Sequence, residues 1–293
     1  MNLIETKNLT KYYSRGKVIG IKDLNLEIEE GEIFGFIGPN GAGKSTTIRL
    51  LLDLIRPSSG SGQVFGLDIN QKSVQIRRGI GFLPGEIFLQ ENMTGQECVD
   101  FYSGFKEKID KNYLKVLLRR FELNLSKRVS AYSKGNKQKL AIVLALMHKP
   151  KLLILDEPTS GLDPINQQEF YNTILETKKW GTTTFFSTHI LTEAEKICDR
   201  VGIIKSGKLL KIENIEDFKE KNIRTIFVET KESIPLSALK SAGLKKIGRT
   251  TNGYKFVTAG PNGEIIKALA KFNITDFKIT EPSLEEIFLH FYK

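Results

Sequence analysis

The sequence predicts an α/β protein in which a mixed, largely parallel sheet with helices is followed by a small α+β domain. Three observations support this fold class. The apolar run Ile33–Ile37 leads through a glycine-rich loop into a helical pattern, the order of a parallel α/β unit. A second apolar run, Leu152–Leu155, has the length and uninterrupted character of a strand buried on both faces of a sheet. Beyond residue 221 the pattern changes to β-α-β-β-α-β, which is typical of a ferredoxin-like sandwich.

Residues 3–33 are predicted to form a small antiparallel sheet at the start of the chain. The segment Asn25–Glu29 alternates polar and apolar side chains, as a strand does when one face is buried and the other is solvated. An antiparallel β subdomain is therefore expected before the main sheet.

The loop after the first buried strand has the G-x-x-x-x-G-K-[ST] pattern of a phosphate-binding loop. It comprises Gly38, Pro39, Asn40, Gly41, Ala42, Gly43, Lys44, Ser45 and Thr46. Its glycines allow backbone N–H groups to surround a polyphosphate, and the following helix adds its dipole. Lys44 would place a positive charge on the β- and γ-phosphates, and the Ser45 hydroxyl would join the Mg²⁺ ligands. The alternative, a glycine turn that only closes a strand–helix unit, is disfavoured because the full pattern seldom arises by chance.

The segment 86–148 is predicted to contain several helices. Tyr113–Phe121 has a helical pattern, and Ser133 is expected to cap the apolar helix that follows it. Lys149-Pro150 ends this helix because proline disfavours the helical conformation in the residue before it. His148 is expected at the C-terminus of the helix, in a position favourable to the helix dipole.

Two carboxylates end the second buried strand. Ligand sites of parallel sheets lie beyond the carboxyl ends of the strands, so Asp156 and Glu157 are expected near the phosphate loop. Asp156 would hold Mg²⁺, directly or through water, and Glu157 would orient and deprotonate the attacking water. An acidic strand end is often just solvated, but downstream of a phosphate loop the catalytic interpretation is favoured.

The chain is predicted to divide into a nucleotide-binding domain, residues 1–220, and a small α+β domain, residues 221–293. Before the boundary, Val201–Leu210 is expected to form a hairpin that turns at Ser206-Gly207. After it, the expected strands are Thr225–Glu229 and Ile274–Ile279, and the expected helices are Leu236–Ala242 and Glu264–Lys271. A hairpin turn is expected at Thr251–Gly253. A final helix is expected to begin with a capping box of Ser283 and Glu286.

Several segments, in order along the chain, resemble the motifs of ATP-binding-cassette (ABC) ATPases. Tyr132–Gln138 is similar to the signature motif, usually written L-S-G-G-Q, and Ser160–Asp163 resembles the D-loop. Ser187–His189 is similar to the switch-histidine segment, and Tyr13 matches the aromatic residue that stacks on adenine. The resemblance covers residues from about 3 to 212. It implies a P-loop NTPase core of ABC type, with an antiparallel β subdomain and a helical subdomain.

The resemblance also implies a nucleotide site that two chains share. In the family the signature segment of one subunit, here Ser133 and Gly135, faces the γ-phosphate held by the phosphate loop of the other subunit. His189 would be catalytic together with Lys44 and the glutamate named above, and Asp163 would belong to the nucleotide-binding set. The cofactors implied are ATP and Mg²⁺.

Two places in the sequence depart from the family pattern. Lys134 takes the place of the first signature glycine and Asn136 that of the glutamine, while the capping serine and the helix dipole are retained. The family commonly has a metal-touching glutamine where this chain has Gly85. Because glycine has no side chain to bind a metal, Glu86 is a candidate substitute; the alternative is a solvated loop glutamate.

Composition and charge are those of an ordinary globular protein, with 40% hydrophobic and 27% charged residues. The net charge of +10 comes from scattered basic pairs, so nucleic-acid binding is not expected. Cys98 and Cys198 stand far apart, which favours buried thiols over a disulfide or a metal site. The start lacks the apolar core of a signal peptide, and the apolar run Leu140–Met147 is far shorter than the about 20 residues of a transmembrane helix.

Together these observations predict a cytoplasmic ATPase subunit of an exporter, peripheral on the inner face of the cell membrane. Two chains would close head to tail around two ATP molecules, and separately encoded integral-membrane subunits would receive the motion. The ending Glu281–Phe291 resembles that of ATPase subunits of two-component (ABC-2 type) drug and sodium exporters. The alternatives are a soluble ATPase of the superfamily that acts on ribosomes or nucleic acid, an importer ATPase, and a nucleotide sensor that switches without turnover.

Overall fold

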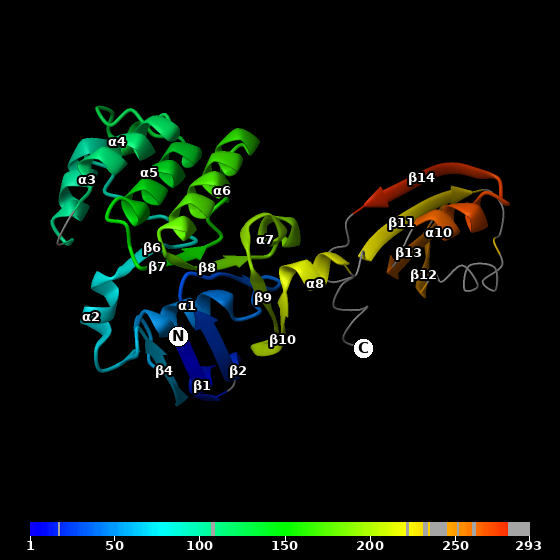
Figure 1. Ribbon diagram of the computed structural model, residues 1–293, viewed down its shortest axis with the longest axis horizontal. Coiled ribbons are helices and arrows are strands. Elements are labelled where there is room, and N and C mark those ends of the chain that lie inside the picture. The colour runs from blue at the N-terminus through cyan, green and yellow to red at the C-terminus, as the bar shows by residue number, and fades with distance from the viewer. Residues whose placement is uncertain are drawn as a thin grey trace. The chain divides into compact units, whose positions relative to one another are not determined.

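Figure 1 shows the computed structural model of the chain, which divides into two compact units, Met1–Glu213 and Asn214–Lys293. The structure describes residues 1–16, 18–106, 109–220, 223–230, 234, 245–250, 252–259 and 262–280. Residue 220, where the sequence places the domain boundary, is the last residue of α8 (Ile215–Glu220). The expected helix 236–242 and the expected ending 281–291 lie outside the described residues.

A six-stranded sheet forms the centre of the first unit, with the strand order β10-β9-β3-β8-β7-β6. Its strands are β3 (Ile33–Ile37), β6 (Ile80–Leu83), β7 (Leu152–Asp156), β8 (Thr183–Thr188), β9 (Arg200–Lys205) and β10 (Lys208–Asn214). β3 pairs in parallel with β8 and β9, and β7 pairs in parallel with β6 and β8. The carboxyl ends of β3, β7 and β8 therefore meet at one edge of the sheet, where ligands bind in folds of this kind.

Burial on both faces explains why these central strands are apolar. Every residue of β3, β7 and β8 is buried. Phe34 and Phe36 of β3 pack against Phe185 of β8, with ring centroids 6.2 and 5.3 Å apart. Aromatic pairs at such distances contribute about 0.5–1.5 kcal/mol beyond the burial of their area. The prediction of a parallel α/β core is confirmed.

The hairpin predicted at Ser206-Gly207 joins β9 to β10 at the edge of the sheet. The φ angles of the two turn residues are 48° and 78°. Two consecutive positive φ angles belong to the turn type whose twist matches the flanking strands. The turn prediction is therefore confirmed.

An antiparallel sheet with the order β2-β1-β4-β5 lies in the same unit. Its strands are β1 (Asn2–Tyr13), β2 (Val18–Glu29), β4 (Ser59–Val64) and β5 (Leu67–Asp68), with the short turn η1 (Ser14–Gly16) after β1. On β2, Leu24, Leu26 and Ile28 are buried and alternate with exposed residues, as the sequence pattern predicts. Phe34 of β3 and residues of α1 (Lys44–Leu51) belong to the same buried cluster, so the two sheets share one core.

Helices flank the sheets. They are α2 (Ser73–Arg78), α3 (Gly95–Ser103), α4 (Lys111–Arg120), η2 (Val129–Ala131), α5 (Lys134–Leu146), α6 (Pro164–Lys179) and α7 (Leu191–Ile197). Of these, α3, α4, η2 and α5 form a helical region between β6 and β7. Thr94 and Glu97 form a capping box at α3, and Asp110 caps α4. Figure 1 shows α3, α4 and α5 gathered on one side of the unit. In the part of the chain that the structure describes, no helix combines the length and the apolar character needed to span a bilayer.

The expectation that His148 complements a helix dipole was wrong. α5 ends at Leu146, and the imidazole of His148 turns inward, where its Nε2 donates a hydrogen bond to the Ile80 carbonyl oxygen at 3.2 Å. Burial, and after it the nearby charge of Lys106, lower the pKa of His148 to about 4. The ring is therefore neutral at pH 7, because its packing against β6 disfavours the charged form that a helix dipole would attract.

The second unit contains an antiparallel sheet with the order β12-β13-β11-β14. Its elements are β11 (Ile223–Thr230), β12 (Lys245–Thr250), β13 (Gly253–Ala259), α10 (Asn262–Leu269) and β14 (Ile274–Thr280). Its core includes Ile226, Val228, Phe256 and Leu269. All neighbouring strands are antiparallel, and the first strand lies between the third and the fourth, as in a ferredoxin-like sheet.

Candidate functional site

The phosphate loop runs from the end of β3 to the start of α1, the strand–loop–helix setting predicted from the sequence. Gly43, the residue before α1, has a φ of 113°, which favours glycine. A Cβ at Gly43 would lie 2.6 Å from the Gly20 carbonyl oxygen, and one at Gly38 would lie 2.3 Å from the Ile204 carbonyl oxygen. Neither position has room for a side chain, so the loop requires glycine at both.

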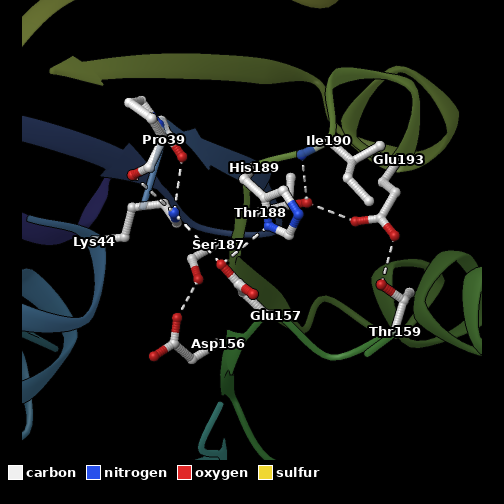
Figure 2. Close-up of polar contacts among 11 residues, drawn as sticks. Pro39, Lys44, Asp156, Glu157, Thr159, Ser187, Thr188, His189, Ile190 and Glu193 are labelled. Carbon is white, nitrogen blue, oxygen red and sulfur yellow. Dashed lines mark hydrogen bonds and ion pairs between the residues drawn. The ribbon is translucent and has the colours of Figure 1, made fainter. Parts of the chain in front are cut away.

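Lys44, the first residue of α1, is held inside this loop. Its side chain is 5% exposed, and its Nζ donates hydrogen bonds to the carbonyl oxygens of Gly38 at 2.7 Å and Pro39 at 3.3 Å. The same Nζ lies 3.5 Å from Oε1 of Glu157 (Figure 2). The loop therefore fixes a buried cation close to the carboxyl end of β7.

Asp156 and Glu157 lie at that carboxyl end. Asp156 is buried and accepts a hydrogen bond from the Ser187 hydroxyl at the end of β8. Glu157 has a φ of 48°, an angle that residues with a side chain seldom adopt. Its N–H donates to the Ser187 carbonyl oxygen at 3.1 Å, which helps hold the backbone in this strained conformation. Strain of this kind is commonly found at functional sites.

The switch-like histidine reaches the same carboxylate. Nδ1 of His189 lies 3.1 Å from Oε1 of Glu157, the oxygen that also faces Lys44. Figure 2 shows Lys44, from the start of α1, and His189, just after β8, both approaching Glu157. Lys44 and His189, which are far apart in the sequence, thus both approach the same carboxylate oxygen of Glu157.

A cavity extends from this group towards Tyr13. It is lined by Tyr13, Val18, Ile19, Gly20, Asn40, Gly41, Gly43, Lys44, Ser45, Thr46 and Glu157. The Tyr13 hydroxyl and the Thr46 hydroxyl are 3.3 Å apart. Gly20 lies against the tyrosine ring, since a Cβ at that position would be 2.7 Å from a ring carbon. An aromatic face, a phosphate loop and a carboxylate in one cavity suit a nucleoside polyphosphate.

A neighbouring cavity contains the oxygen groups expected around a divalent cation. Ser45, Gly85, Glu86, Asp156 and Glu157 are among its lining residues. Hydroxyl and carboxylate oxygens are the protein ligands that Mg²⁺ prefers, commonly completed by substrate phosphates. Among the described residues, no group of three or more His, Cys, Asp or Glu could hold a metal by itself. The residues present therefore fit a Mg²⁺ that is shared with a phosphate.

Ser133, Gly135 and Asp163 line neither of these cavities. Ser133 caps α5, as predicted, by accepting a hydrogen bond from the Asn136 N–H at 3.2 Å. Asp163 caps α6 by accepting from the Asn166 N–H at 3.0 Å, and hydrogen bonds from Asn166 lower the pKa of Asp163. Both capping residues are exposed. One chain therefore does not bring its signature segment to its own phosphate loop.

Other residues of the site were given no role from the sequence. Ser187 was named only as the start of the segment similar to the switch histidine, but in the structure its hydroxyl donates to Asp156 near the end of β8. Gly20 and Ile19 line the cavity beside Tyr13, but nothing in the local sequence distinguishes them, because the pairing of β1 with β2 brings them there.

Comparison with known proteins agrees with this site. Residues 21–160 match the family described as ABC transporter. The chain is 34% identical over 291 residues to the bacitracin transport ATP-binding protein BcrA of Bacillus licheniformis, covering 98% of this chain and 85% of that protein. It is 38% identical to an ABC transporter ATP-binding protein of Nostoc sp. (strain PCC 7120), covering 71% of this chain and 65% of the relative's length.

The fold is also that of solved ABC cassettes. The ATP-binding cassette MJ0796, in a dimeric post-hydrolysis state bound to ADP and Pi, superposes with a TM-score of 0.66 at 25% identity, over 72% of this chain and 98% of that one. The fold and the site define a P-loop protein that binds ATP and hydrolyses it. The chain belongs to the family of ABC transporter ATP-binding proteins.

Proposed function

We propose that this ATPase powers export by closing as a head-to-tail dimer on two ATP molecules and passing the motion to separately encoded integral-membrane subunits. The observation that carries this proposal is that the two halves of a nucleotide site, the phosphate-loop half and the signature half, lie apart within one chain. Lys44, Glu157 and His189 meet at one cavity, whereas Ser133 caps an exposed helix end outside that cavity. A second copy of the chain would supply the missing half.

The geometry supports a role for each residue in hydrolysis. Glu157 accepts a proton from the attacking water at a carboxylate oxygen, because it lies beside the phosphate loop. His189 holds that carboxylate through Nδ1, and Lys44 places its charge on the terminal phosphates. A Mg²⁺ bound by Ser45 and Asp156 would neutralise charge on the phosphate oxygens.

Closure of the dimer would couple ATP binding to movement. The α5 N-terminus, with the Ser133 hydroxyl, would meet the γ-phosphate in the partner chain, where a helix dipole favours negative charge. ATP can drive closure only to the extent that it binds the closed dimer more tightly than the open chains. Release of the cleaved phosphate removes that difference, so the dimer reopens after hydrolysis. The dimeric state of the MJ0796 cassette supports this arrangement.

An apolar groove in the first unit supports a membrane-embedded partner. It is lined by Leu52, Leu54, Arg77, Ile80, Phe82, Pro84, Ile87, Phe88, Leu89, Tyr102, Lys106, Ala141, Leu144, Ala145 and His148. Phe88 is 83% and Leu54 is 55% exposed, which is unusual for large apolar side chains that line one groove. A short helix from an integral-membrane subunit, with an apolar face, would cover them. The chain would then lie peripherally at the cytoplasmic face of the membrane.

The direction of transport is inferred from relatives. BcrA is named a bacitracin transport protein, and YbhF of Escherichia coli, 36% identical over 222 residues, is named a probable multidrug transporter component. These names support an exporter rather than an importer.

Light scattering of the Glu157→Gln variant tests the shared site. Without the carboxylate base, ATP should stay bound and the closed dimer should accumulate, so Mg-ATP should double the measured mass. The wild-type chain with ADP is the matched control and should remain monomeric. A variant that binds ATP yet stays monomeric at all protein concentrations would refute closure by ATP alone.

A further inference from the structure

A buried carboxylate lies between the two segments that carry Glu157 and His189. Glu193, in the first turn of α7, is 5% exposed. Its Oε1 accepts a hydrogen bond from the Thr159 hydroxyl at 2.5 Å, and its Oε2 accepts one from the Thr188 hydroxyl at 2.5 Å. Figure 2 shows both bonds, with Glu193 bridging the two threonines.

A buried phenol lies near this network. Burial raises the pKa of Tyr171 well above its usual range, and the charge of Glu193 adds to the shift. The carboxylate of Glu193 itself receives hydrogen bonds from two segments, the loop after β7 and the end of β8. A polar network that satisfies its buried groups in this way fixes their positions, because any shift leaves a buried group without a partner.

Both threonines are close neighbours, in the chain, of the hydrolytic pair. Thr159 follows Glu157 across Pro158, whose ring restricts the backbone between them. Thr188 directly precedes His189, and its hydroxyl oxygen also accepts the N–H of Ile190 at 3.0 Å. The network therefore holds the backbone after Glu157 and on both sides of His189.

We propose that Glu193 is a positioning residue for ATP hydrolysis, which keeps Glu157 and His189 in contact by holding the backbone segments that carry them. The proposal rests on the roles proposed above for these two residues. A glutamine of the same shape cannot replace the carboxylate. A carboxylate offers an acceptor oxygen to each threonine hydroxyl, whereas a carboxamide turns one of these oxygens into a donor.

The simpler alternative is that Glu193 only stabilises the start of α7. Ile190, the N-cap residue of this helix, has no side chain that caps it, and Glu193 closes no capping box there. Its hydrogen bonds instead go to the hydroxyls of Thr159 and Thr188. A structural role of this kind would change the stability of the fold but leave the environment of the His189 ring unchanged.

Histidine-selective NMR separates the two roles, because the chain has only three histidines. The His189→Ala variant identifies the His189 resonance. In Glu193→Gln, Thr159→Val and Thr188→Val, that resonance should shift in the direction in which Glu157→Gln shifts it, and the His148 resonance should stay in place. Thr177→Val is the matched control, since Thr177 is also buried but its hydroxyl bonds only to the Ile174 carbonyl oxygen of its own helix.

Steady-state kinetics provide the second measurement. Glu193→Gln and Thr159→Val should lower kcat by about 10- to 100-fold, the usual effect of a small misplacement, with KM for ATP unchanged. In a His189→Ala background, Glu193→Gln should cause no further loss, because the contact that it positions is already gone.

An unshifted His189 resonance in all three network variants would overturn the proposal, and so would a loss that appears only in KM. If Thr177→Val caused the same shifts and losses, general destabilisation would explain them. A different result would contradict the proposed hydrolytic roles. If Glu157→Gln hydrolysed ATP at the wild-type rate, those roles would be wrong, but the NMR result on the Glu193 network would still stand. Should Glu193→Gln not fold, Thr159→Val and Thr188→Val carry the test alone.

Discussion

Glu157 combines a strained backbone with a central position in the site. Its φ of 48° places it in the left-handed region, which costs a residue with a side chain on the order of 1–3 kcal/mol. The strain is maintained by a backbone hydrogen bond to β8 and by the contacts of its carboxylate with Lys44 and His189. A glycine would fit this backbone more easily, but it would remove the only acceptor on which both contacts depend.

His148 makes the stability of the protein depend on pH. Its folded pKa of about 4 lies below the ordinary 6.5, so between these values the unfolded chain binds a proton that the folded chain does not. Stability is therefore complete above pH 6.5 and falls as the pH drops towards 4. We expect the melting temperature of the wild type to fall more between pH 7 and pH 5 than that of His148→Gln, by an amount equivalent to about 1–2 kcal/mol.

The difference between the two proteins isolates this effect, because all the other titrating groups are common to both. Glutamine keeps a donor for the Ile80 carbonyl oxygen but does not titrate. Parallel melting curves for the two proteins across this pH range would show that His148 is not held neutral by burial.

Two helices of the first unit begin with the same local device but are expected to differ in function. Thr94 caps α3 and Ser133 caps α5, each through a side-chain oxygen that accepts the N–H three residues on. The sequence analysis predicts the cap at Ser133, and the structure adds the one at Thr94. Only α5 begins in a segment that resembles the family signature, so only its capping hydroxyl is proposed to meet a phosphate.

Substituting the two caps separates stability from catalysis. Ser133→Ala and Thr94→Ala should each lower the free energy of unfolding by about 1 kcal/mol, because each leaves a helix N–H without its partner. Only Ser133→Ala should also reduce ATP turnover, by roughly tenfold or more, as expected for a lost hydrogen bond to a charged group. Equal turnover in the two variants, measured well below their melting temperatures, would exclude Ser133 from the nucleotide site.

At the scale of the whole molecule, the protein needs surfaces for two kinds of partner. The hydrolytic half-site is proposed to face a second copy, and the apolar groove around Phe88 is proposed to receive a membrane subunit. Phe88 lines both the groove and the cavity of Ser45 and Asp156, whereas Ile87 lines the groove but not that cavity. A substitution at Ile87 should therefore affect the groove and leave the hydrolytic half-site intact.

Ile87→Asp should therefore prevent capture of integral-membrane protein from solubilised membranes, while ATP-dependent dimerisation in the Glu157→Gln background persists. The reason is that burying a carboxylate in an apolar contact is strongly unfavourable. Val74→Asp is the control, because Val74 is 62% exposed but does not line the groove. Undiminished capture by Ile87→Asp would place the membrane contact elsewhere. Capture of ribosomes by the wild type would favour the ribosome-acting class of ATPase.

The sequence by itself determined the local elements and much of the hydrolytic group. The strand–loop–helix around Lys44, the buried strand ending in Asp156, the hairpin at Ser206-Gly207 and the cap at Ser133 all follow from side-chain patterns of a few residues. Patterns of this length reflect local backbone preferences and periodic burial, which do not depend on distant parts of the chain.

Only the tertiary structure decided how distant residues act on one another. The neutral ring of His148 depends on its burial against β6, and the Glu193 network depends on the approach of three separate elements. The cavity beside Tyr13 likewise depends on the pairing of β1 with β2. Burial and hydrogen bonding between segments far apart in the chain set these properties, and no local pattern encodes a pKa or a contact across the fold.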